Sequence, residues 1–193
     1  MPNRKVLHHI STGERLYCMR KFTMTLTILC LSLMVAGLAL ASAPPQVGSA
    51  APAFSLPSQE GKPVSLDQLK GKWVVLYFYP KDFTSGCTIE AHNFQRDLAK
   101  YEAANAVILG VSHDSADSHK EFCAKEGLNF KLLADTEGKV SDAYGSVMEG
   151  RNLSARNTFL ISPDGKIAKV YTSVNPSQHS TDVLADIAEL QKK

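Results

Sequence analysis

Cys87 is the residue best placed to do chemistry in this 193-residue chain. It follows a continuous apolar run at 73–79 and precedes a segment with helical spacing, so it is expected at the turn between a strand and a helix. The first amides of a helix point at such a sulfur, and the helix dipole favours its thiolate, which is the nucleophilic form. The position predicts a reactive thiol, with an inert, buried structural cysteine as the alternative.

Two neighbours of Cys87 in the sequence have side chains that suit such a site. Thr84 lies three residues earlier, where its hydroxyl can turn toward the sulfur and bind a substrate oxygen, or can simply cap the turn. Pro80 has no N–H and a fixed φ, so it ends the strand and can shield the sulfur from water.

The elements that must position these residues predict an α/β domain. The runs at 73–79 and 106–111 lack polar alternation, as strands buried on both faces do. Helical patterns follow at 88–101 and 118–127, the second opening on a capping-box sequence at Ser118. A short strand is expected at 130–134.

The C-terminal part completes the predicted fold. A Pro-Asp-Gly turn joins strand candidates at 157–161 and 166–171, and an amphipathic helix around 183–190 ends the chain. The element order predicts a thioredoxin-like α/β sandwich. Its mixed central sheet is parallel in its first part, carries an antiparallel hairpin at one side and has helices on both faces.

The pattern Pro80-x-x-x-Thr84-x-x-Cys87 resembles the active-site signature of the peroxiredoxins. The flanking Tyr-Phe-Tyr-Pro-Lys-Asp, Gly-Cys-Thr and Glu-Ala are similar to the branch called bacterioferritin comigratory protein or peroxiredoxin Q. The resemblance covers most of residues 47–190, although Phe83 and Ser85 depart from the branch's usual loop. It implies a thiol-dependent peroxidase that reduces hydrogen peroxide and organic hydroperoxides through a cysteine sulfenic acid.

Arg156 matches the second signature of the same family, in Arg-Asn-Thr-Phe-Leu-Ile-Ser-Pro-Asp-Gly-Lys. A guanidinium beside the sulfur would stabilise the thiolate and the charge on the departing oxygen. Arg151 lies close by, but Arg156 directly precedes the strand and fits the family pattern. An isolated arginine would otherwise be a solvated surface residue.

Cys123 lies 36 positions after Cys87, on a different predicted helix. In one form of the branch a resolving cysteine follows five residues after the first, where this chain has His92. In a second form it lies on the later helix, which fits Cys123. The resemblance implies that Cys123 closes an intrachain disulfide with Cys87, which a thioredoxin-like protein then reduces. A permanent disulfide and a buried free thiol are the alternatives.

Residues 1–43 resemble a secretory signal peptide, with a basic start, an apolar run at 22–43 and a small-x-small end at Ala41-Ser42-Ala43. An uncleaved membrane anchor at 22–43 is the alternative. Residues 44–193 would form the single peroxiredoxin domain, exported and most simply periplasmic. Residues 1–43 contain five of the 21 Lys and Arg and one of the 19 acidic residues, so residues 44–193 carry a net charge of −2. This charge gives no reason to expect a nucleic-acid partner.

The sequence indicates no metal or organic cofactor, since the histidines form no ligand pattern and sulfur supplies the redox chemistry. We expect surface or capping roles for the histidines. Glu90 is expected as an exposed acid of the first helical turn, with a contact to a Lys or Arg network at the helix start as the alternative. Without a large apolar strip, we expect a monomer. Two other classes of function compete with the peroxidase. A thioredoxin-fold disulfide exchange protein is disfavoured because Cys-x-x-Cys is absent, and a non-enzymatic module would hold a structural Cys87–Cys123 disulfide.

Overall fold

The computed structural model describes residues 43–172 and 174–192. The predicted leader or anchor at residues 1–43 lies outside the described residues except for residue 43. In the part of the chain that is described, no helix is both long enough and apolar enough to span a bilayer.

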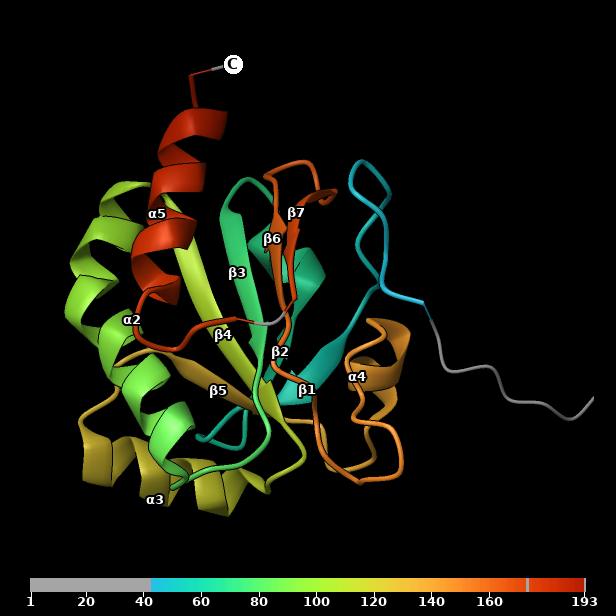
Figure 1. Cartoon of the computed structure of the whole chain (residues 1–193), viewed down its shortest axis with the longest axis vertical. Coiled ribbons are helices and arrows are strands. Elements are labelled where there is room, and N and C mark those ends of the chain that lie inside the picture. Colours follow the sequence, from blue (N-terminus) through green and yellow to red (C-terminus); the bar gives the residue numbers. More distant parts are fainter. Residues whose placement is uncertain (1–42, 173, 193) are drawn as a thin grey trace, which may run out of the picture. The chain divides into compact units, whose positions relative to one another are not determined.

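A five-stranded mixed sheet forms the centre of the domain, in the order β5-β4-β3-β6-β7 (Figure 1). The strands are β3 (Trp73–Phe78), β4 (Ala106–Ser112), β5 (Lys131–Ala134), β6 (Thr158–Ile161) and β7 (Ile167–Tyr171). Strands β3, β4 and β5 are parallel, whereas β6 is antiparallel to both β3 and β7. This is the predicted thioredoxin-like arrangement, with the hairpin on one side.

Both faces of the sheet are buried, and β3 shows why its sequence has no polar alternation. Val75 and Tyr77 join an apolar cluster on one face, while Leu76 and Phe78 join a separate cluster on the other. Successive strand residues point to opposite faces, so a strand covered on both sides needs apolar residues at every position.

Helices α2 (Ser85–Ala103) and α5 (His179–Leu190) lie against one face of the sheet, and α3 (Ala116–Glu126) extends this layer at the lower end of Figure 1. The other face is covered by α4 (Lys139–Ala143), the 3-10 turn η1 (Leu66–Leu69) and a hairpin of β1 (Ser55–Pro57) and β2 (Pro63–Ser65). The prediction of helices on both faces is confirmed.

The start of α3 differs from the sequence-based expectation. Ser115, not Ser118, is the N-cap, and its hydroxyl accepts the Ser118 N–H at 3.2 Å. The helix begins earlier because the Ser115 hydroxyl satisfies an N–H group of the first turn, which has no partner within the helix. The Ser118 side chain is thereby left available for a contact outside the helix.

Candidate active site

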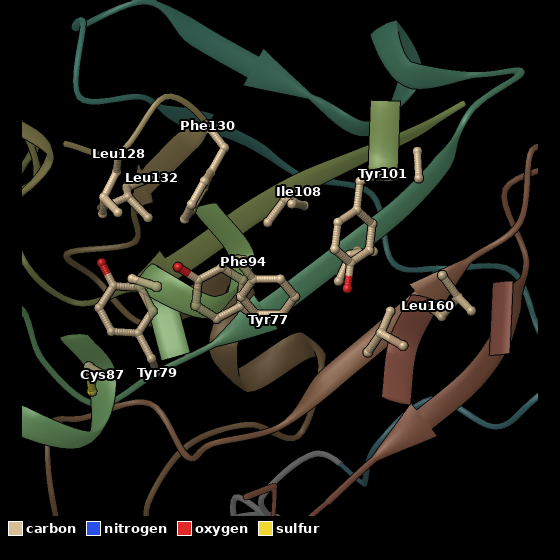
Figure 2. Close-up of a cluster of buried hydrophobic side chains, with 14 of the residues drawn as sticks. Tyr77, Tyr79, Cys87, Phe94, Tyr101, Ile108, Leu128, Phe130, Leu132 and Leu160 are labelled. Carbon is tan, nitrogen blue, oxygen red and sulfur yellow. The ribbon is translucent and has the colours of Figure 1, made fainter. Parts of the chain in front are cut away.

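Cys87 lies in the first turn of α2, directly after the loop that leaves β3. Thr84 is the N-cap residue, and its carbonyl accepts the Thr88 N–H at 2.9 Å. The Cys87 side chain is 2% exposed and belongs to the aromatic cluster between α2 and the sheet (Figure 2). The sulfur therefore lies at the positive end of the helix dipole, where the first N–H groups have no partner within the helix, and it is largely shielded from water.

Arg156 contacts the sulfur from the segment that precedes β6. Its Nη2 atom donates to Cys87 Sγ at 3.2 Å. The antiparallel register sets Tyr77 opposite Thr158, so the segment entering β6 lies beside the loop leaving β3. Arg151, the nearby alternative, is exposed and makes no contact with Cys87.

Glu90 completes this group, so the expectation of an exposed acid is wrong and the alternative, a contact to an arginine, is what the structure shows. It is fully buried, and Arg156 Nη1 donates to its Oε2 atom. Burial raises the pKa of Glu90 to about 7, against the opposing effect of Arg156. Burial would lower the pKa of Arg156, but the charges of Glu90 and Cys87 raise it. The i, i+3 spacing from Cys87, which puts both residues on one helix face, is the signal that could have identified Glu90.

Thr84 and Pro80 both lie in the segment that leads from β3 to Cys87. The exposed Thr84 hydroxyl donates to the Lys81 carbonyl at 2.9 Å, which is the local turn contact considered as its alternative role. A hydroxyl that donates to a carbonyl keeps its own lone pairs, so this oxygen can still accept a hydrogen bond from a hydroperoxide. Pro80 is half-buried and follows Tyr79, where the sheet ends.

Cys123 lies in the last turn of α3, and its thiol, like that of Cys87, is free. The residue is 8% exposed and belongs to the same apolar cluster as Cys87. Burial raises the pKa of the Cys123 thiol to about 11, and the charge of Asp82 adds to this effect. An open groove between the β1–β2 turn and α3 reaches Cys123, lined also by Glu60, Asp117 and Lys120.

Two histidines are buried, whereas the sequence led to the expectation of surface or capping roles. His119 is fully buried, and His179 is 2% exposed with its Nε2 atom 2.8 Å from Thr158 Oγ1. Burial lowers the pKa of His179 to about 4, and nearby Arg156 adds to this effect. Among residues 43–172 and 174–192, no cluster of His, Cys, Asp and Glu has the composition of a metal site.

Comparison with known proteins now identifies the family. The model of the AhpC/TSA family matches residues 47–170. The chain belongs to this family. A protein of Coxiella burnetii named putative peroxiredoxin bcp is 41% identical over 145 residues, which cover 72% of this chain and 96% of that protein. As a peroxiredoxin of this kind, the chain is a thiol-dependent peroxidase.

Solved structures of peroxiredoxins share the fold. The bacterioferritin comigratory protein of Xanthomonas campestris, whose structures concern alkyl peroxide reduction, is 34% identical, with a TM-score of 0.69 over 77% of this chain and 99% of that chain. Two structures of X. campestris peroxiredoxin Q carry serine in place of one or the other of two cysteines 36 positions apart, the spacing of Cys87 and Cys123. Each is 36% identical with a TM-score of 0.67, and they cover 71% and 72% of this chain and 91% and 92% of those chains.

Proposed function

We propose that Cys87 is the residue that attacks the peroxide. Its thiolate attacks the terminal oxygen, and an S–O bond forms as the O–O bond breaks. The other oxygen, which bears the alkyl group or a hydrogen, leaves and takes up a proton to become an alcohol or water. The sulfur is oxidised to a sulfenic acid, and the peroxide is reduced by the same two electrons. The observation that carries this proposal is the 3.2 Å contact from Arg156 to a buried sulfur at a helix start.

The surrounding residues have different roles in this first step. Arg156 stabilises both the attacking thiolate and the charge that develops on the departing oxygen, and Glu90 holds the guanidinium in place. Thr84 orients the peroxide by accepting its O–H, while Pro80 limits access of water to the sulfur. Hydrogen peroxide and organic hydroperoxides are both substrates. Phe83 and Ile89, exposed at 43% and 46%, offer apolar surface to an alkyl group near the Cys87 loop.

In the second step, Cys123 resolves the sulfenic acid. Its thiolate attacks Cys87 Sγ, the intrachain S–S bond forms and the hydroxyl leaves as water. The two thiols are free and lie on separate helices, and burial disfavours the Cys123 thiolate, so this step requires a local opening. The equal cysteine spacing in the X. campestris protein supports the pairing.

A thioredoxin-like dithiol protein returns the disulfide to two thiols by exchange. We further propose that the chain acts as a monomer and is exported to the periplasm. The export rests on the leader-like residues 1–43, and it requires a reductant supplied to an oxidising compartment. Cell fractionation would test the location, and light scattering the oligomeric state.

The decisive experiment follows the thiols of the reduced protein after mixing with hydrogen peroxide in a rapid-mixing instrument. The wild type should lose both thiols quickly, Cys87→Ser should not react beyond the rate of free cysteine, and Cys123→Ser should stop at a sulfenic acid that dimedone traps. A wild type no faster than free cysteine would remove the peroxidase mechanism. In that event, a loss of stability on reduction would favour the disulfide-stabilised module.

A further inference from the structure

A buried polar cluster outside the peroxide site surrounds Asp82, in the loop that precedes Cys87. The Asp82 carboxylate is 3% exposed and accepts three hydrogen bonds. The donors are Tyr79 Oη at 2.7 Å, Ser118 Oγ at 2.7 Å and His119 Nδ1 at 2.8 Å. Burial alone would raise the pKa of Asp82, but the bonds from His119, Tyr79 and Ser118 together lower it. Asp82 is therefore a buried carboxylate held in its charged form.

His119 is bound at both ring nitrogens to groups that only accept. Nδ1 faces the Asp82 carboxylate, and Nε2 lies 3.2 Å from the Leu133 carbonyl. Tyr79 Oη also lies 3.3 Å from Nδ1, so the ring is enclosed by polar partners. The hydrogen bond between His119 and the ionised Asp82 carboxylate is buried on both sides, and bonds to a charged acceptor are stronger than neutral ones.

The position of this cluster connects the two parts of the chain that carry the cysteines. Asp82 lies five residues before Cys87, and His119 lies four residues before Cys123 on α3. The loop is tied to the start of α3 a second time, because the Asp114 carboxylate accepts the Asp82 N–H at 3.0 Å. The Cys87 loop and α3 are thus held together by hydrogen bonds of Asp82, while the thiols of Cys87 and Cys123 are free.

We propose that this cluster, Asp82 with Ser118 and His119, is a latch that holds the closed site and sets the rate at which Cys123 reaches the sulfenic acid. The inference rests on the proposed function, in which Cys123 resolves Cys87. In this proposal, opening separates the loop from α3 and so breaks these hydrogen bonds. Each bond that only the closed state makes lowers the population of the open state. Asp82, Ser118 and His119 are positioning residues, since none of them contacts Cys87 Sγ.

The latch has a consequence for damage to the enzyme. While the site stays closed, the sulfenic acid remains beside Arg156, where a second peroxide can oxidise it to the sulfinic acid. Opening removes the sulfenic acid by disulfide formation. A weaker latch should therefore favour the disulfide and protect Cys87, and a stronger latch should have the opposite effect.

Ser118→Ala is the most direct test, because it deletes one hydrogen bond to the carboxylate and leaves the contact between Asp82 and His119 in place. A hydrogen bond to a charged group is strong enough to change the opening equilibrium by about tenfold. We expect disulfide formation about tenfold faster and proportionally less sulfinic acid per turnover, with the rate of Cys87 oxidation unchanged. Quenched-flow samples trapped with dimedone and analysed by mass spectrometry give all three quantities.

Ser115→Ala is the matched control. It removes the N-cap bond to the Ser118 amide, and so weakens the start of α3 by a similar amount, without touching Asp82. The latch predicts a much smaller change in disulfide formation for this variant. Equal acceleration by Ser115→Ala and Ser118→Ala would overturn the inference in favour of simple fraying of α3.

Asp82→Asn tests whether the carboxylate is the shared partner. With the charge gone, the remaining amide oxygen can accept only a neutral hydrogen bond from Ser118, so adding Ser118→Ala should accelerate disulfide formation less than it does in the wild type. Unchanged or slower disulfide formation in the Ser118→Ala and Asp82→Asn variants refutes the latch. Failure of the proposed function has a different signature, since the wild-type protein itself would then form no Cys87–Cys123 disulfide.

Discussion

Replacement of Arg156 by glutamine should slow peroxide attack by about a hundredfold. Unit charges 3.2 Å apart, the distance between Arg156 Nη2 and Cys87 Sγ, attract by about 5 kcal/mol at an effective dielectric constant of about 20. The negative charge of Glu90 offsets part of this attraction, and 20% of the Arg156 side chain is exposed. We therefore expect a net loss of about 3 kcal/mol in the transition state, in the range measured for removal of one oxyanion-binding donor.

The measurement is the second-order rate constant for oxidation of Cys87, obtained in a single turnover from competition with a peroxidase of known rate. Arg151→Gln is the matched control, because it removes the same charge five residues earlier from an exposed position. Arg156→Lys should recover only part of the rate, since an ammonium cannot contact the sulfur and Glu90 through two nitrogens at once. An Arg156→Gln rate within threefold of the wild type, or an equal loss in Arg151→Gln, would refute the assigned role.

Three further predictions concern buried groups. Because the folded state holds the pKa of Glu90 at about 7 while the unfolded chain ionises near 4.5, this residue should reduce stability as the pH rises from about 4.5 to 7. Urea unfolding at both pH values should show a fall of up to about 3 kcal/mol that Glu90→Gln abolishes; an equal fall in the variant would contradict this. Burial holds the pKa of Cys123 near 11, so in the folded Cys87→Ser variant at pH 8 it should react with iodoacetamide about a hundredfold more slowly than in the same protein unfolded in urea. Mass spectrometry measures both rates, and equal rates would argue against the buried thiol. Gly110→Ala should lower stability by about 1–3 kcal/mol in thermal unfolding, because the new Cβ would lie 2.6 Å from Leu132 Cδ2 and 2.7 Å from Tyr77 Oη; an unchanged melting temperature would show that the core adapts.

The parts of the fold that local patterns describe were predictable from the sequence. The strand at 73–78 is recognisable because a strand covered on both faces must be apolar throughout, and the Pro-Asp-Gly turn marks the β6–β7 hairpin. Arg156 was selected because it matches the family's second signature and precedes a strand, and the sheet topology explains its position. It precedes a strand whose antiparallel pairing with β3 brings the start of β6 to the end of β3, where Cys87 follows.

The errors concern side chains whose partners lie far away in the sequence. Glu90 looks like an ordinary exposed acid of a first helical turn until Arg156, 66 positions later, is placed beside it. His119 has its carboxylate partner 37 positions earlier, at Asp82. A local pattern shows which residues lie on one helix face, but only the topology shows what that face contacts. Polar residues buried through distant pairs are therefore the ones most easily assigned to the surface.

The two steps of the proposed mechanism require opposite surroundings for sulfur, and this conflict would explain how the site is organised. Peroxide attack needs the closed arrangement, because only there does Arg156 contact Cys87 in a site shielded from water. The same closure keeps Cys123 buried with a pKa of about 11, so it is protonated at the moment when a thiolate is needed. A chain fixed in the closed state would oxidise quickly and then accumulate sulfinic acid, and one fixed in the open state would lack the contribution of Arg156. The contacts between the Cys87 loop and α3 must therefore be strong enough to assemble the first site and weak enough to break within each catalytic cycle.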